Sequence, residues 1–323
     1  FPTSADTAVY LGEGTKGSQA NVLLKAGDDV TVNGTLTFGG TATDTRTTLT
    51  VGAGGLIYGY GGTVTIPSLI VDGGKIACNN NTDPTIKGAC EIGDAGCCLY
   101  SDNIPFDVAR DIVLSASLSG SRSASIQVFT TLNGTAYKQT EKGPLDSQSK
   151  SVIGGDASAF NGQYLIKPEV EPGTTYYPYY RAGGTLHLVS ATALAGNDGT
   201  SFPDKIAVYE PSQLYLSEAA AAGAHANNGM TVTGAQNWIG TVSDSERAVI
   251  SMPITGTGAL IKRGVGEVVF NGGSEFGFTM AIPWDGKVRF GGPVGYGVMR
   301  YSGGRASSLA LNATSQRHTA VEP

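Results

Sequence analysis

Apolar and polar residues alternate with a period of two along the first third of the chain. The alternation is clearest in the runs 30–38, 48–51 and 63–66, where Val, Leu, Ile or Phe alternate with Thr at most positions. Successive side chains of a strand point to opposite faces, so this pattern predicts short strands with one face in an interior and the other in water. Similar runs return at 184–189, 205–209, 213–216 and 230–233.

Paired glycines end several of these strands. The runs 36–40, 268–273 and 288–292 all finish in Gly-Gly, and Phe270 and Phe290 lie 20 positions apart. One coil of many β-solenoids takes about 20 residues. Glycine supplies 47 of the 323 residues, and only 15% of the chain is charged, whereas average proteins hold about 7% glycine and about 25% charged residues. The sequence therefore predicts an all-β fold, a parallel β-helix (β-solenoid) with glycine-rich corners.

The middle of the chain differs from its flanks. The runs 111–118 and 125–132 are longer, and Asn133-Gly134 is a hairpin signal that leads into 135–139. We therefore expect N-terminal rungs over 1–100, an inserted antiparallel β region over 101–182, and C-terminal rungs over 183–323. Only 216–224 favours a helix, with Ser217 as its N-cap.

The four cysteines fall within 21 positions, as Cys78, Cys90, Cys97 and Cys98. Zinc sites usually pair cysteines two to four residues apart, and this spacing fits them poorly. We expect two disulfides that pin the loop 78–98. Three pairings are open, and bridges from the adjacent pair to Cys78 and Cys90 are favoured because a bond between neighbouring cysteines is strained.

Disulfides persist in oxidising compartments, and Phe1 begins the chain as a mature protein begins after signal-peptide removal. Both observations predict an extracellular, cell-surface location. The net charge of −6 without clustered Lys and Arg argues against nucleic acid as a partner. No apolar run approaches the length of a membrane span, which argues against membrane insertion.

Candidate chemistry is sparse, and we expect no catalysis, no cofactor and no metal site. Parallel β-helices can also be polysaccharide lyases or glycoside hydrolases, which place acidic residues on one face of the coil, and this carbohydrate-active enzyme is the alternative. The acids that could serve it are Asp94, Asp102, Asp107, Asp111 and Glu267. The histidines at 187, 225 and 318 show no metal-ligand spacing.

Two segments offer contacts with other molecules. Tyr176, Tyr177, Tyr179 and Tyr180 surround Pro178 and could form a ligand or interface platform, or could pack the middle region against the coil. Val9, Tyr10 and Leu11 belong to a strand that could cap the coil or be donated to a neighbouring copy. We expect Trp238 and Trp284 to lie in the core or at rung edges.

The segment 256–273, read with 286–292, resembles the autotransporter-associated β-strand repeat of bacterial surface proteins, a glycine-spaced strand followed by a second strand. The resemblance implies an exported parallel β-helix used for adhesion or as a fibrous coat, with no catalytic residues. We therefore expect a secreted structural or adhesive protein, with self-assembly into fibres as one form. Its expected partners are further copies of itself, joined head to tail, or surface glycans.

Overall fold

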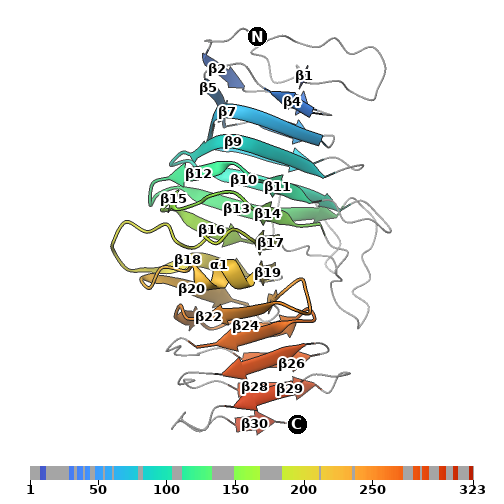
Figure 1. Ribbon diagram of the computed structural model, residues 1–323, viewed down its shortest axis with the longest axis vertical. Coiled ribbons are helices and arrows are strands. Elements are labelled where there is room, and N and C mark those ends of the chain that lie inside the picture. Colours follow the sequence, from blue (N-terminus) through green and yellow to red (C-terminus); the bar gives the residue numbers. More distant parts are fainter. Residues whose placement is uncertain are drawn as a thin grey trace.

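The computed structural model is an elongated stack of parallel strands, with β1 and β2 at one end and β30 at the other (Figure 1). The structure describes residues 8–11, 29–32, 35–38, 41–43, 48–53, 55–59, 62–78, 83–103, 111–132, 149–167, 184–210, 212–234, 237–271, 279–283, 286–290, 298–302, 308–311 and 320–322. The expected β-solenoid is confirmed.

The described strands form three sheets, named here A, B and C. Sheet A follows the order β1 (Ala8–Leu11), β3 (Thr35–Phe38), β6 (Leu56–Gly59), β8 (Gly74–Cys78), β10 (Cys97–Asn103), β13 (Ser125–Leu132), β16 (Gln163–Ile166), β18 (Phe202–Tyr209), β20 (Asn228–Thr233) and β23 (Ile254–Gly256). Sheet C follows the order β22 (Arg247–Ile250), β25 (Glu267–Phe270), β27 (Lys287–Phe290) and β29 (Ser308–Leu311).

Sheet B is the longest. Its order is β2 (Asp29–Val32), β5 (Thr48–Gly52), β7 (Gly62–Asp72), β9 (Pro84–Ile92), β11 (Ile112–Leu114), β14 (Ser151–Ile153), β17 (Thr185–Leu188), β19 (Ser212–Leu216), β21 (Asn237–Gly240), β24 (Ala259–Arg263), β26 (Thr279–Pro283), β28 (Val298–Ser302) and β30 (Ala320–Glu322). Three further strands join its edges, namely β4 (Thr41–Thr43), β12 (Ser117–Gly120) and β15 (Ala159–Phe160).

Inward-facing side chains form ladders that run along the stack. In sheet A, Ile57, Ile76, Leu99, Val128 and Ile166 occupy matching positions on successive strands, each at most 1% exposed. Stacked aliphatic side chains of this kind remove a continuous apolar layer from water, which is the main stabilising contribution to a fold built from short strands. The predicted period-two strands supply these ladders.

The middle region continues the coil rather than forming the expected antiparallel insertion. Within 101–182, the described strands β11, β13, β14 and β16 pair in parallel with the strands before and after them. The prediction of an antiparallel insertion is therefore wrong for the described strands. The hairpin signal at Asn133-Gly134 lies outside the described residues.

One short helix, α1 (Glu218–Ala222), follows β19 and is confirmed close to its predicted position. The Ser217 hydroxyl accepts a hydrogen bond from the Ala220 amide at 3.0 Å, as an N-cap does. Among the described residues, no helix has the length and apolar character needed to cross a membrane.

Candidate functional site

The cysteines do not form the expected disulfides, and the structure records no bond among the four. Cys97 pairs with Gly74 on β8, four positions before Cys78, which separates the two cysteines by about 13 Å along the strand direction. A disulfide requires Cα atoms about 4.4–6.8 Å apart. Cys98 pairs with Lys75 and is likewise too distant from Cys78. The prediction of bridges from Cys78 to the adjacent pair is therefore wrong.

Cys90 instead takes an aliphatic position in the core. It lies between Leu69 and Leu118 on the neighbouring strands of sheet B and is 1% exposed. Burial raises the pKa of the Cys90 thiol to about 12, and the nearby Glu91 carboxylate adds to the shift. Burial also raises the pKa of Cys97. These two thiols behave as small hydrophobic side chains.

Several other predicted residues lie outside the described part of the chain. They are the tyrosines at 176, 177, 179 and 180, Asp107, Trp284 and His318. The predicted strand Val9 to Leu11 belongs to β1, which pairs in parallel with β3 of the same chain. The strand is therefore the end strand of sheet A within its own chain, and both capping of the coil and donation to a neighbouring copy stay predictions.

The outer face of sheet C gathers basic side chains, and we call Arg247, Lys287 and Arg289, with Glu267 between them, the basic face. Glu267 stands opposite Arg247 on β22 and Lys287 on β27. Its carboxylate accepts contacts from Arg247 Nε at 2.9 Å and from Arg289 Nε at 3.1 Å. Two arginines therefore contact one carboxylate, and a lysine lies at the paired position on the next strand, in a chain whose net charge is −6.

The two arginines are available to a ligand. Their side chains are 49% and 50% exposed, whereas that of Glu267 is 15% exposed. Both contacts to Glu267 use Nε, and in the described part of the chain no residue takes up the Nη hydrogens. A guanidinium carries five N–H donors in a planar fork, so each arginine presents further donors to an anion. This face can hold carboxylate or sulfate groups.

A second group lies on the outer face of sheet B, where four residues form a square that we call the outer block. Thr185 and His187 lie on β17, and Gln213 and Tyr215 stand directly opposite them on β19. All four point away from the core ladder, because Leu186, Leu188, Leu214 and Leu216 face inward on the same strands. Even so, Thr185, Gln213 and Tyr215 are only 1%, 4% and 5% exposed.

An acid–base pair adjoins the outer block. Lys150 Nζ lies 3.6 Å from Asp111 Oδ2, and Asp83 accepts a hydrogen bond from the Asp111 amide at 2.9 Å. Burial raises the pKa of Asp111 even though Lys150 opposes the shift. Burial, followed by the charge of Lys150, lowers the pKa of His187 to about 4. The structure thus places an acid, a lysine and a neutral imidazole on one face of the coil.

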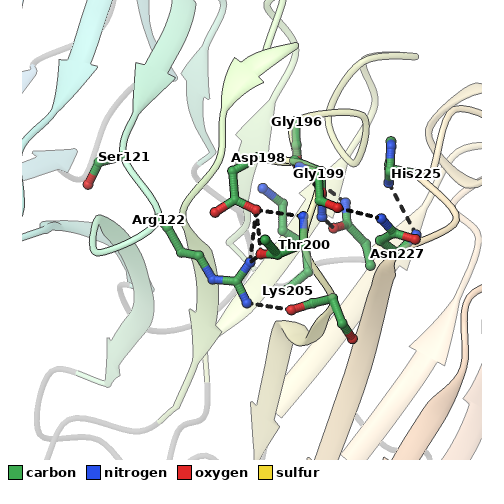
Figure 2. A network of polar contacts seen from close by, with 12 residues as sticks. Ser121, Arg122, Gly196, Asp198, Gly199, Thr200, Lys205, His225 and Asn227 are labelled. Carbon is green, nitrogen blue, oxygen red and sulfur yellow. Dashed lines mark hydrogen bonds and ion pairs between the residues drawn. The ribbon is translucent and has the colours of Figure 1, made fainter.

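A third network, seen in Figure 2, is built around Arg122 at the corner between β12 and β13. Arg122 donates to Asp198 Oδ1 at 3.1 Å and to the Thr200 hydroxyl and Ser201 carbonyl, and its guanidinium lies 4.1 Å from the centre of the Phe202 ring. These partners follow Arg122 by 76 or more positions, so the side chain ties distant coils together. Both Nη atoms are engaged within the protein, which indicates a structural role.

Sequence reasoning found some of these groups and missed others. Asp111 and Glu267 were recognised as candidate acids, but the contacts of Glu267 with Arg247 and Arg289, 20 and 22 positions away, were not foreseen. The outer block was missed, because its residues are 28 positions apart and only the strand register brings them together. Trp238, expected in the core or at a rung edge, faces outward on β21 but is only 7% exposed.

The fold and these sites define the chain as a parallel β-solenoid protein with polar groups on its outer faces. No protein family matches the chain, and no relative was found among curated proteins or among solved structures.

Proposed function

We propose that this chain is a structural, adhesive protein of the cell surface that holds acidic polysaccharides on its basic face. The observation that carries the proposal is the pairing of Arg247 and Arg289 with Glu267, which orients two half-exposed guanidinium groups on one sheet face. The extracellular location belongs to the same proposal.

The elongated stack of coils, called the rod below, supports the structural part of this role. Sheet B continues from β2 to β30 through successive parallel pairings, so one end of the described chain is connected to the other by unbroken strand contacts. A stack of this kind acts as a spacer, since each coil contacts its neighbours along one axis. Among the described strands, β1 and β30 each pair along one edge, and pairing of the other edge with another copy would produce fibres.

The basic face supports the adhesive part. Arg247 and Arg289 lie on strands separated by β25, so their backbones are about 10 Å apart along the stack, and their side chains converge on Glu267 between them. A linear polymer that carries repeated carboxylate or sulfate groups could therefore contact both arginines at once. Charge-assisted hydrogen bonds to guanidinium groups are about twice as strong as neutral ones.

Binding to immobilised heparin, a sulfated polysaccharide, and to polygalacturonate, a carboxylated one, tests the proposal. The Arg289→Gln change should weaken binding by about tenfold, because it removes one charge-assisted contact. Lys87→Gln is the matched control, because Lys87 is an exposed lysine on β9 at a distance from sheet C. Equal binding by the two variants, or no binding by the unchanged protein, would count against the basic face.

Electron microscopy of the same preparation tests assembly. Filaments with an axial repeat close to the length of one rod would support head-to-tail association. Isolated rods at high protein concentration would argue against a fibre subunit and leave the adhesive role to be judged by the binding assay.

A carbohydrate-active enzyme is the second candidate, and the contact between Asp111 and Lys150 favours it. A carboxyl group with a raised pKa beside a lysine is an arrangement that glycan-cleaving sites use for proton transfer. New reducing ends released from polygalacturonate, and their loss in Asp111→Asn, would establish the enzyme. If the unchanged protein binds the polymer without cleaving it, the adhesive role is favoured.

A further inference from the structure

The outer block places a nucleophile against an amide. Gln213 Nε2 donates a hydrogen bond to the Thr185 hydroxyl oxygen at 3.2 Å. The amide carbon is bonded to Nε2, so it lies at most about 4.5 Å from that oxygen. Because the Thr185 oxygen accepts this bond, its own hydrogen remains available to a base, and the described residues show no acceptor for it.

The amide oxygen of Gln213 has a donor of its own. The Tyr215 hydroxyl donates to Gln213 Oε1 at 3.4 Å. A donor at this position withdraws electron density from the amide carbon and would stabilise the negative charge that develops on the oxygen during attack. The distance is long for a hydrogen bond and can shorten as that charge forms.

His187 offers a base on the same strand face as the nucleophile. It follows Thr185 by two positions on the same face of β17, and its ring centre lies 6.3 Å from that of Tyr215. Its Nε2 atom is buried and has no hydrogen-bond partner. Among the described residues, the charged groups near this imidazole are Lys150 and, beyond it, Asp111. An unpartnered imidazole nitrogen can accept the proton of a neighbouring hydroxyl.

We propose that Thr185 and Gln213 become joined by an intramolecular ester bond. The Thr185 oxygen attacks the side-chain carbonyl carbon of Gln213 while its proton passes to His187 Nε2. The tetrahedral intermediate carries its negative charge on Oε1, beside the Tyr215 hydroxyl. When the carbon–nitrogen bond breaks, the amide nitrogen takes the proton from His187 and leaves as ammonia. The products are one ester and one ammonia, and neither oxidant nor reductant takes part.

Burial supports both the formation and the survival of this bond. Thr185 and Gln213 are 1% and 4% exposed, so water has little access to hydrolyse the ester. The two side chains are fixed on paired strands, which gives the reaction the advantage of an intramolecular step. The ester would connect β17 to β19 covalently and resist separation of two successive coils. This inference does not depend on polysaccharide binding.

The mass of the intact, denatured chain is the first measurement. We expect the unchanged protein, after incubation at neutral pH, to be lighter than its sequence by the mass of one ammonia. Thr185→Val keeps the shape of the side chain but lacks the nucleophile, so it should show its full sequence mass. The matched control Thr231→Val removes a hydroxyl from the outer face of sheet A and should keep the deficit.

The variants also separate the ester from other losses of ammonia. An Asn-Gly step such as Asn228-Gly229 loses ammonia when it forms a succinimide, but that loss would persist in Thr185→Val. A deficit that persists in Thr185→Val, or an unchanged protein with its full sequence mass, would overturn the proposal. His187→Ala should slow ester formation and raise the unlinked fraction, and an unaffected rate would remove His187 from the mechanism.

Peptide mapping of the unchanged protein is a second test, and it does not depend on whether a variant folds. Trypsin cleaves after Arg181, Lys205 and Arg247, which places Thr185 in peptide 182–205 and Gln213 in peptide 206–247. We expect these two peptides to be recovered as one branched species that hydroxylamine separates. Recovery of both as separate, unmodified peptides would contradict the ester.

Discussion

Lys205 should control the pH dependence of stability near neutrality. Its side chain is completely buried, and Nζ donates to the Phe160 carbonyl at 2.6 Å while lying 4.8 Å from the Phe160 ring centre and 5.6 Å from that of Tyr164. Burial, followed by the charge of Arg122, lowers the pKa of Lys205 from 10.5 to about 7. An amino group in this position is destabilising whenever it must carry a proton.

The direction of this pH dependence follows from proton binding by Lys205. Between pH 7 and pH 10 the unfolded chain keeps Lys205 protonated while the folded chain releases the proton, so the free energy of unfolding rises with pH. The difference between the two pKa values corresponds to about 5 kcal/mol of destabilisation below pH 7. About 2 kcal/mol of this is recovered between pH 7 and pH 8.5.

The comparison with Lys205→Met isolates this effect, because methionine cannot titrate. At pH 7 the variant gains about 4 kcal/mol by removing the buried ammonium and loses about 1–3 kcal/mol by leaving the Phe160 carbonyl without its donor. We therefore expect Lys205→Met to be more stable at pH 7, with the difference shrinking as pH rises.

Urea unfolding followed by tryptophan fluorescence at several pH values from 7 to 8.5 measures this difference. The range stops there because the raised pKa values of Cys90 and Tyr164 reduce stability at higher pH, where the unfolded thiol and phenol ionise first. Parallel pH profiles for the two proteins would refute the reasoning. So would a variant that is less stable at pH 7.

Three further predictions concern the core. Gly88→Ala should lower the free energy of unfolding by at least about 2 kcal/mol, since φ is +102° and a Cβ would lie 1.9 Å from the Ile66 carbonyl oxygen. The urea concentration at the midpoint of unfolding measures this loss, and an unchanged midpoint would contradict the prediction. Leu214→Ala should cost about 2–5 kcal/mol, because the side chain is 1% exposed in the core ladder, and a smaller loss in calorimetry would show that the core closes around the cavity. A thiol reagent should modify half-buried Cys98 before buried Cys90, as peptide mapping can show, and the reverse order would contradict the assigned burial.

Much of the fold could be predicted from local patterns. The period-two runs gave the strands, because the alternation of side chains across a strand is a property of a single segment. Ser217 and the alanines after it gave the position of α1, since capping and helix propensity act within a few residues. The β-solenoid followed from the repeated combination of short strands and glycine corners.

The direction of pairing in the middle region was not predictable in this way. The runs that became β11 and β13 are longer than their neighbours and precede a hairpin signal, yet both strands pair in parallel with partners from other coils. An alternating strand can pair in either direction, so its own sequence does not choose between them. The choice was made by the continuous core ladders that the parallel stack provides.

The sequence by itself determined the strands, their inward faces and the helix α1, since each depends on side chains a few positions apart. Tertiary structure alone decided the sites. Only the register places Thr185 opposite Gln213 and Glu267 opposite Arg247, and only the same register separates Cys78 from Cys97. Register is set by the packing of whole coils against one another, so residues that share a site need have no recognisable spacing along the chain.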